Sequence, residues 1–222
     1  MQGKFNFMPI IAPSLLSANF LHLAADCQLL NESQADWFHL DVMDGQFVPN
    51  ISFGLPIISQ IRTATTKVCD VHLMIAQPEH YIQAFKDAGA DVLTVHIEAC
   101  VHLHRQIQQI KQLGMKAGVA VNPHTSVHLL SDIIQDIDVV CLMSVNPGFG
   151  GQHFIPQTLE KIAALKQMIQ QKQSQCLIEI DGGVTLENAP RILEAGADIL
   201  VAGNTVFKSA DPKATIAALK AL

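Results

Sequence analysis

Eight short apolar runs, separated by longer amphipathic stretches, constrain the fold of this chain more than any other feature. Each run has the length and residue content of a buried β-strand, and the stretches between them have the spacing typical of helices. The expected strands cover residues 10–13, 37–43, 67–74, 92–97, 116–121, 139–144, 176–181 and 199–202. Strands that alternate with helices form parallel sheets, so the sequence predicts an α/β fold.

A weak repeat supports this count of units. Asp87-Ala-Gly-Ala-Asp91 and Glu194-Ala-Gly-Ala-Asp198 each follow an expected helix and precede an expected strand, and Glu32-Ser-Gln-Ala-Asp36 is a third, less regular copy. Eight such units close readily into a (β/α)8 TIM barrel, which we predict. A doubly wound open sheet is the alternative that the spacing leaves open. The expected helices include residues 78–88, 102–113, 156–171 and 186–195, with a short extra helix at 205–208.

Length and composition fit one domain of residues 1–222. Apolar residues make up 49% of the chain and charged residues 15%, which permits a large core and disfavours disorder. The formal net charge is −6 and no run of Lys or Arg occurs, so we expect neither a nucleic acid nor a membrane as partner. Prolines and polar residues interrupt the apolar N-terminal region, which disfavours a signal peptide there. The five cysteines form no CxxC pair, and we expect a reducing, cytoplasmic location.

Ionisable side chains occupy one face of three expected strands, because side chains alternate along a strand. The residues that share these faces are His39, Asp41 and Met43; Asp70, His72 and Met74; and Glu179 and Asp181. The opposite faces are apolar and suit contact with helices. The ionisable residues should therefore point into the barrel, where a charge is costly unless it is paired, hydrogen-bonded or bound to metal.

Four of these residues lie at or near the carboxyl ends of their strands, where the chemistry of such barrels takes place. They are His39, Asp41, His72 and Asp181. Two imidazoles and two carboxylates suit Zn²⁺, Fe²⁺ or Mn²⁺ better than Ca²⁺. A hydrogen-bonded network without metal is the alternative for any one of them, and for all four together we favour a metal site.

Three further inward-facing residues are weaker candidates. We expect Asp70 deeper in the barrel as a structural partner. His96 and Glu98 share the inward face of the fourth strand, and a place for His96 behind the metal ligands is as well supported as ordinary packing.

Glycine-rich turns follow the last three expected strands. Val145-Asn-Pro-Gly-Phe-Gly-Gly-Gln152 comes after the sixth, Asp181-Gly-Gly183 after the seventh and Ala202-Gly-Asn204 after the eighth. Backbone N–H groups in such turns bind phosphate without cationic side chains, and phosphate sites after strands seven and eight recur in this fold. Tight βα turns alone would explain one glycine pair. Three adjacent turns favour phosphate binding.

Together these segments resemble the ribulose-phosphate 3-epimerase family. The matching stretches span nearly the whole chain: Ala12-Pro-Ser-Leu-Leu-Ser-Ala-Asn-Phe20, His39-Leu-Asp-Val-Met-Asp-Gly45, Asp70-Val-His-Leu-Met74, Asn146-Pro-Gly-Phe-Gly-Gly-Gln152, Asp181-Gly-Gly-Val184 and Ala202-Gly-Asn204. The first, second and fourth are quite specific. In the last, the family usually has serine where this chain has Asn204, and we expect little loss of phosphate binding because the amide can also donate.

The resemblance implies a barrel of the ribulose-phosphate-binding type and the interconversion of D-ribulose 5-phosphate and D-xylulose 5-phosphate, a step of the pentose phosphate pathway. By this resemblance, His39, Asp41, His72 and Asp181 would hold one divalent ion per subunit, Zn²⁺ or Fe²⁺, with Mn²⁺ or Co²⁺ also compatible. Asp41 and Asp181 would move the C3 proton through a metal-stabilised cis-enediolate. A homo-oligomer, dimer or hexamer, is also implied.

The resemblance assigns the remaining substrate contacts as well. Ser14 and His72 would touch the sugar. The phosphate would lie against Gly148, Phe149, Gly150, Gly151, Gly182, Gly183, Gly203 and Asn204. Met43, Met74 and Met143 would cover the planar intermediate with polarisable, non-basic surface, and ordinary packing is the alternative for them.

Two enzyme classes and one binding class compete with this interpretation. An epimerase of a longer ketose, such as allulose 6-phosphate, would share the mechanism. The sequences of lyases and decarboxylases on related barrels carry a motif similar to Asp-x-Lys-x-x-Asp after a strand. This chain has Met43 in place of that lysine, which counts against these classes. A non-catalytic sugar-phosphate binding module would have no need for two carboxylates among four metal ligands.

Overall fold

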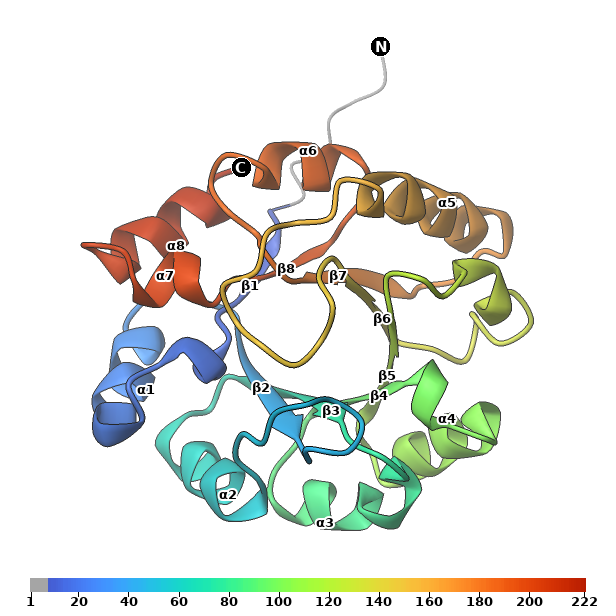
Figure 1. The fold of residues 1–222 in the computed structure, drawn as a ribbon, viewed down its shortest axis with the longest axis horizontal. Helices are drawn as coiled ribbons and strands as arrows, with labels where there is room; N and C mark the ends of the chain where they lie inside the picture. The colour runs from blue at the N-terminus through green and yellow to red at the C-terminus, as the bar shows by residue number, and fades with distance from the viewer. Residues whose placement is uncertain (1–7) are drawn as a thin grey trace.

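Eight parallel strands form one closed barrel in this computed structural model, which describes residues 8–222 (Figure 1). The strands are β1 (Ile10–Ala12), β2 (Trp37–Met43), β3 (Val68–Met74), β4 (Val92–His96), β5 (Lys116–Val121), β6 (Val139–Met143), β7 (Leu177–Asp181) and β8 (Ile199–Val201). All eight predicted strands are confirmed to within one residue at each end. The alternative of a doubly wound sheet is wrong, because the sheet order runs β1-β8-β7-β6-β5-β4-β3-β2 without reversal.

The first and second strands close the barrel. The backbone N–H of His39 donates to the Pro13 carbonyl at 3.1 Å, and the N–H of Asp36 donates to the Ile11 carbonyl at 2.9 Å. Ser14 and His39 form a parallel bridge at the same seam. This closure brings the segment after β1 beside the carboxyl end of β2.

Helices surround the barrel (Figure 1). The α-helices are α1 (Leu23–Asn31), α2 (Leu55–Ala64), α3 (Ile82–Asp87), α4 (Leu103–Gln112), α5 (Thr158–Gln171), α6 (Ala189–Glu194), α7 (Asn204–Phe207) and α8 (Pro212–Lys220). The 3₁₀ turns are η1 (Leu15–Ser17), η2 (Phe20–His22), η3 (Pro78–His80), η4 (Ile97–Ala99) and η5 (Val127–Leu130). Among residues 8–222, no helix has the length and apolar content needed to cross a membrane.

Two predicted helices are shorter than expected. The segment at 78–88 divides into η3 and α3, because Gln77 adopts a left-handed backbone conformation and the chain turns before the α-helix begins at Ile82. Helix α6 begins at Ala189, not at Leu186, because Thr185 and Asn188 close a turn in front of it. The backbone N–H of Thr185 donates to Asn188 Oδ1 at 2.8 Å.

The core has an outer and an inner part. The outer part lies between strands and helices and contains fully buried side chains such as Phe38, Leu40 and Leu73. The inner part fills the amino-terminal end of the barrel with residues from the strand starts, including Trp37 and Val92. This plug leaves the carboxyl ends of the strands as the open end of the barrel.

The aspartate that ends each copy of the sequence repeat has a structural role that the motif itself does not reveal. An aspartate stands directly before each even-numbered strand and accepts a backbone N–H of the preceding odd-numbered strand at 2.8 Å. Each of these carboxylates also pairs with a lysine or arginine within 3.2 Å. The four aspartates are Asp36, Asp91, Asp138 and Asp198. These aspartates therefore join the strands in pairs. Asp138 makes the same contacts as the other three, although no copy of the repeat motif precedes it.

Candidate active site

The four predicted ligands converge at the open end of the barrel. His39 and Asp41 extend from β2, His72 from β3 and Asp181 from β7, and one ligand atom from each lies within 4.8 Å of all the others. Asp41 Oδ1 lies 3.2 Å from both His39 Nε2 and His72 Nδ1. Asp181 Oδ2 lies 3.5 Å from His72 Nδ1. The predicted alternation of side chains along β2, β3 and β7 is therefore confirmed.

The donors fit a divalent cation of the zinc and iron type. Two imidazole nitrogens and two carboxylate oxygens point at one place, and His39, Asp41 and His72 are buried. His39 Nδ1 lies 2.6 Å from Asp70 Oδ2, which suits an N–H donating to that carboxylate. The other ring nitrogen of His39 is then left to face the cluster with a free lone pair.

The imidazoles and carboxylates of the cluster shift one another's pKa values. Burial penalises charge on Asp41, but the neighbouring His39 and His72 outweigh this penalty and hold the pKa of Asp41 below its ordinary range. Burial also disfavours the charged form of His72, but hydrogen bonds to Asp181 and Asp41 outweigh it and raise the pKa of His72 to about 9. In the same way, Asp41 and Asp70 raise the pKa of His39. The positive charge that these shifts favour on the two imidazoles balances the Asp41 carboxylate, and a divalent cation would take the place of their protons.

A second layer of polar side chains lies deeper in the barrel, two residues before the ligands of β3 and β7. Asp70 contacts His39 from this layer, which confirms its expected place as a structural partner deeper in the barrel. Glu179 is fully buried, and its Oε1 lies 3.9 Å from His39 Nδ1. Burial and the nearby Asp70 carboxylate raise the pKa of Glu179 well above its ordinary value, which favours its protonated form.

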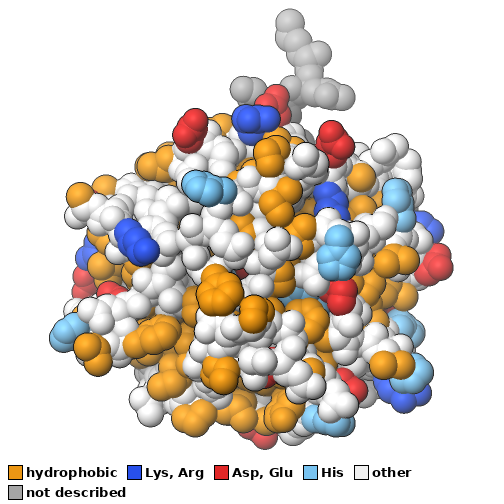
Figure 2. Space-filling view, in the orientation of Figure 1, with side chains coloured by type: hydrophobic (Ala, Val, Ile, Leu, Met, Phe, Trp, Pro, Cys, Tyr) orange, Lys and Arg blue, Asp and Glu red, His pale blue; other side chains and the backbone are white. Residues whose placement is uncertain are grey.

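A cavity of about 600 Å³ opens above the four ligands. Every predicted site residue except His39 and His72, which lie buried beneath, lines this cavity: Ser14, Asp41, Met43, Met74, Met143, Gly148, Phe149, Gly150, Gly151, Asp181, Gly182, Gly183, Gly203 and Asn204. The loop between β6 and α5 passes across the front of the barrel (Figure 1). Hydrophobic side chains gather over the centre of this face, and most charged side chains lie nearer its rim (Figure 2).

The glycine turns meet at one side of the cavity because β6, β7 and β8 are neighbours in the barrel. Within residues 8–222, the backbone N–H groups of Gly182, Gly183 and Asn204 donate no hydrogen bond to the chain. The short helix α7 begins at Asn204, one residue before its predicted start. These turns offer unpaired donors of the kind that bind an anion.

Two of these turns require glycine. Gly183 has a φ of +64°, and a Cβ atom there would lie 2.5 Å from the backbone nitrogen of Phe154. Gly151 has a φ of +76°, and a Cβ atom there would meet the amide of Asn204. The asparagine at position 204 therefore packs against the turn that follows β6.

Ser14 and the methionines occupy distinct parts of the cavity. Ser14 Oγ donates to Asp41 Oδ2 at 2.5 Å, which fixes the carboxylate oxygen that does not face His72. Met43 and Met74 pack with Val48 beside Leu16 and Phe47. Met143 packs with Ala120 and Cys141. The methionines thus combine exposure to the cavity with ordinary packing.

Some cavity residues were not predicted. Ser17 belongs to the matching stretch 12–20, and its hydroxyl approaches Gly203, so that stretch was the signal for it. His153 lines the cavity from the loop after β6, Glu187 from the segment before α6 and Arg191 from α6 itself. No pattern in the sequence marks these three, because their places at the cavity depend on how the loop after β6 and the segment around α6 fold.

Comparison with known proteins agrees with this geometry. The profile of the ribulose-phosphate 3 epimerase family matches residues 10–207. Ribulose-phosphate 3-epimerase of Bacillus subtilis (strain 168) is 51% identical over 95% of this chain and 97% of its own. The chloroplastic ribulose-5-phosphate-3-epimerase of Arabidopsis thaliana is 46% identical over 96% of this chain and 76% of its own. The solved structure of KGPDC from Streptococcus mutans shares the fold at 12% identity, with a TM-score of 0.70 over 96% of this chain and 96% of its own.

Proposed function

The chain belongs to the ribulose-phosphate 3-epimerase family and is therefore an isomerase, and we propose that it inverts C3 of D-ribulose 5-phosphate with Asp41 and Asp181 as the two proton carriers at a divalent metal site. One observation supports this mechanism above all. Two carboxylates and two imidazoles converge directly beneath a cavity whose other side carries three glycine turns.

His39, Asp41, His72 and Asp181 would hold the metal, with Zn²⁺ or Fe²⁺ preferred by this donor set. When bound, the cation supplies electrostatic stabilisation of the negative charge that develops on the substrate oxygens. The fit of four donors within 4.8 Å of one another supports this assignment.

Asp41 and Asp181 would transfer the proton at C3. Inversion requires removal of a proton from one face of the carbon and delivery to the opposite face, so it needs two groups on different sides of the substrate. The two aspartates enter the cavity from β2 and β7, which are separated in the barrel by β1 and β8. One of them would start ionised and the other protonated. The Ser14 hydroxyl would orient Asp41 and contact the sugar.

The glycine turns would hold the phosphate with their unpaired N–H groups. This fits an acidic chain that must bind an anion, because backbone donors add no net charge. Met43, Met74 and Met143 line the cavity on the side of the metal ligands. They would cover the planar intermediate with a surface that does not compete for its proton.

The chain would also act as a cytoplasmic homo-oligomer, a dimer or hexamer. Several large apolar side chains are exposed on one chain, including Phe20, Leu21 and Ile51. Exposed apolar groups of this size are common at subunit interfaces. Light scattering of the purified protein gives the mass directly, and a monomer at micromolar concentration would contradict this assignment.

The test of the function is conversion of ribulose 5-phosphate by the purified protein before and after removal of metal. We expect xylulose 5-phosphate to form, activity to fall after chelation and to return with Zn²⁺ or Fe²⁺. Activity that is unchanged after verified metal removal would contradict the metal site alone. Conversion of allulose 6-phosphate with no conversion of ribulose 5-phosphate would assign the longer substrate.

A further inference from the structure

The ring of His72 uses both of its nitrogens. Nδ1 faces Asp41 at 3.2 Å and Asp181 at 3.5 Å. Nε2 faces the opposite way, and it lies 2.9 Å from Nε2 of His96. Both rings are fully buried and stack with centroids 5.0 Å apart. Bulk water therefore does not reach this nitrogen, and His96 is its partner.

Two facing ring nitrogens at this distance share one hydrogen, so one must donate and the other accept. A metal at the site takes a lone pair on Nδ1 of His72, which leaves the proton of that ring on Nε2. Nε2 of His96 must then accept. The remaining hydrogen of His96 must lie on its Nδ1.

Glu98 supplies the acceptor that this arrangement needs. Its Oε2 lies 3.1 Å from Nδ1 of His96. An ionised carboxylate can only accept, so it selects the form of His96 with hydrogen on Nδ1 and none on Nε2. The chain of hydrogen bonds then runs in one direction, from His72 to His96 to Glu98.

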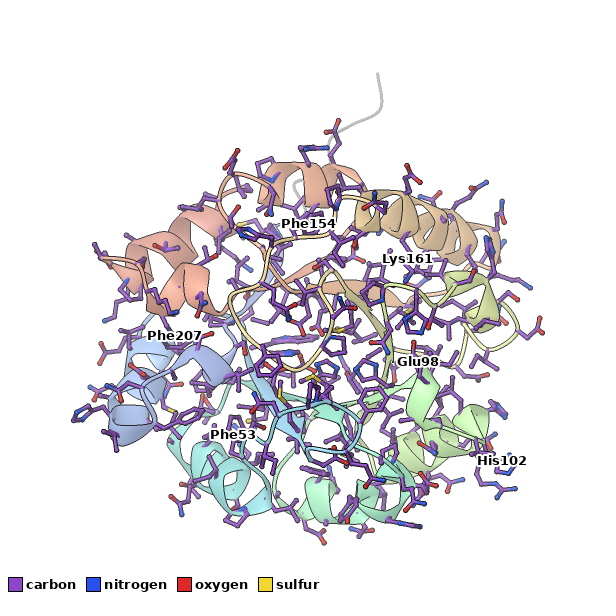
Figure 3. The ribbon with its side chains drawn as sticks, in the orientation of Figure 1. Phe53, Glu98, His102, Phe154, Lys161 and Phe207 are labelled. Carbon is purple, nitrogen blue, oxygen red and sulfur yellow. The ribbon has the colours of Figure 1, made fainter. Side chains whose placement is uncertain are left out.

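The outer end of this chain is anchored to two other elements. The backbone N–H of Asn122 donates to Oε1 of Glu98 at 2.9 Å. Lys161 of α5 donates to the carbonyls of Asn122 at 2.6 Å and Pro123 at 3.1 Å. Glu98 and Lys161 lie on the same side of the barrel mouth in Figure 3. Glu98 is thus fixed by the segment after β5, which α5 holds in turn.

We propose that His96 and Glu98 are positioning residues that orient His72 and reserve its Nδ1 for the metal. The two histidine ligands are then held in different ways at the ring nitrogen that faces away from the ligand cluster. Nδ1 of His39 contacts the Asp70 carboxylate directly, whereas Nε2 of His72 is linked to the Glu98 carboxylate through His96. Partners of this kind fix both the ring orientation and the position of the hydrogen. The inference rests on the proposed metal site and goes beyond its four ligands.

Metal affinity of paired His96 variants tests the proposal. His96→Phe keeps an aromatic ring but has no acceptor for His72, and we expect Co²⁺ binding measured by calorimetry to weaken about 10–100-fold. His96→Gln places an amide oxygen near the position of Nε2 and should recover most of the affinity. His104→Phe, on the exposed surface of α4, is the control and should bind as the wild type does. Circular dichroism checks that each variant folds.

The outcomes separate the two claims. If the wild type binds no Co²⁺, Zn²⁺ or Fe²⁺, the metal site itself is wrong. If the wild type binds and folded His96→Phe binds equally well, the positioning role is wrong while the metal site stands.

A second measurement needs no variant. The ¹⁵N spectrum of histidine-labelled, Zn²⁺-loaded wild type should show His96 protonated on Nδ1 alone and His72 protonated on Nε2. Hydrogen on Nε2 of His96 would overturn the proposal.

Discussion

Gly183→Ala tests how tightly the proposed phosphate turn is packed. Comparison with other Gly→Ala variants separates the steric cost of an added Cβ atom from the cost of a left-handed backbone conformation. A Cβ atom at this position would lie 2.5 Å from the nitrogen of Phe154 and 2.9 Å from the carbonyl oxygen of Gln152. Both are backbone atoms, so the turn must move by about 1 Å to reach ordinary contact distance. The φ of +64° adds the cost of the left-handed region, about 1–2 kcal/mol for a residue with a Cβ atom.

Two other glycines provide matched controls. Gly114→Ala carries a φ of +76°, but the nearest atom, Lys86 Nζ, is 4.0 Å away, so this variant reports the backbone cost alone. Gly54 has a negative φ of −138°, and a Cβ atom there would meet nothing within 4 Å, so Gly54→Ala carries neither cost.

Urea unfolding should order the three variants. We expect the free energy of unfolding to fall by less than about 0.5 kcal/mol for Gly54→Ala. The expected loss is about 1–2 kcal/mol for Gly114→Ala. It is about 2–5 kcal/mol for Gly183→Ala, where overpacking adds to the backbone cost. Gly183→Ala should also raise the KM for ribulose 5-phosphate about 10-fold or more, because displaced N–H groups lose hydrogen bonds to a charged group. A Gly183→Ala protein as stable as Gly114→Ala, with an unchanged KM, would refute this reasoning.

Three further predictions concern the rest of the chain. Burial raises the pKa of Cys69 to about 11 and that of Cys100 to about 12, so neither thiol should react with Ellman's reagent in the native protein at pH 8, whereas unfolded protein should react fully. Leu40→Ala should lower the free energy of unfolding by about 2–5 kcal/mol, because it leaves a cavity in the fully buried outer core. A loss below about 1 kcal/mol would contradict this and would show that the surrounding side chains fill the cavity. Burial opposes charge on Glu98, but His96 and backbone donors outweigh it and lower its pKa from 4.5 to about 2. The charged form therefore stabilises the fold fully above about pH 4.5, and this contribution is lost as the pH falls towards 2. The difference in the free energy of unfolding between wild type and Glu98→Gln should therefore stay constant above about pH 5 and narrow as the pH falls from about 4.5 towards 2.

The strands and the four ligands could be predicted because their signal is local. Alternation along β2 alone places His39 and Asp41 on the face opposite Phe38 and Leu40, and the structure confirms this. The glycine turns follow from chain order, since each comes directly after a strand.

Other features depend on how distant segments meet. The contact between His72 and His96 joins β3 and β4 through the stagger of the strands and the rotation of two rings, neither of which leaves a mark in the sequence. Arg191 lines the cavity from α6, which begins after the turn that Thr185 and Asn188 close. Asp138 performs the same task as Asp91 without sharing its sequence motif, because the task requires only a carboxylate before a strand.

The two-carboxylate mechanism is tested most directly by Asp41→Asn and Asp181→Asn, each loaded with metal. Asparagine keeps a ligand oxygen but cannot carry a proton, so the change removes one proton carrier and leaves the donor set largely intact.

In deuterated water, the wild type should form xylulose 5-phosphate labelled at C3. Each variant should lose net conversion by about 10²–10⁴-fold. The carboxylate that remains should exchange the C3 hydrogen of one epimer only, and the two variants should differ in which epimer they label. Conversion at the wild-type rate by either metal-loaded variant would contradict the assignment of Asp41 and Asp181 as the two proton carriers.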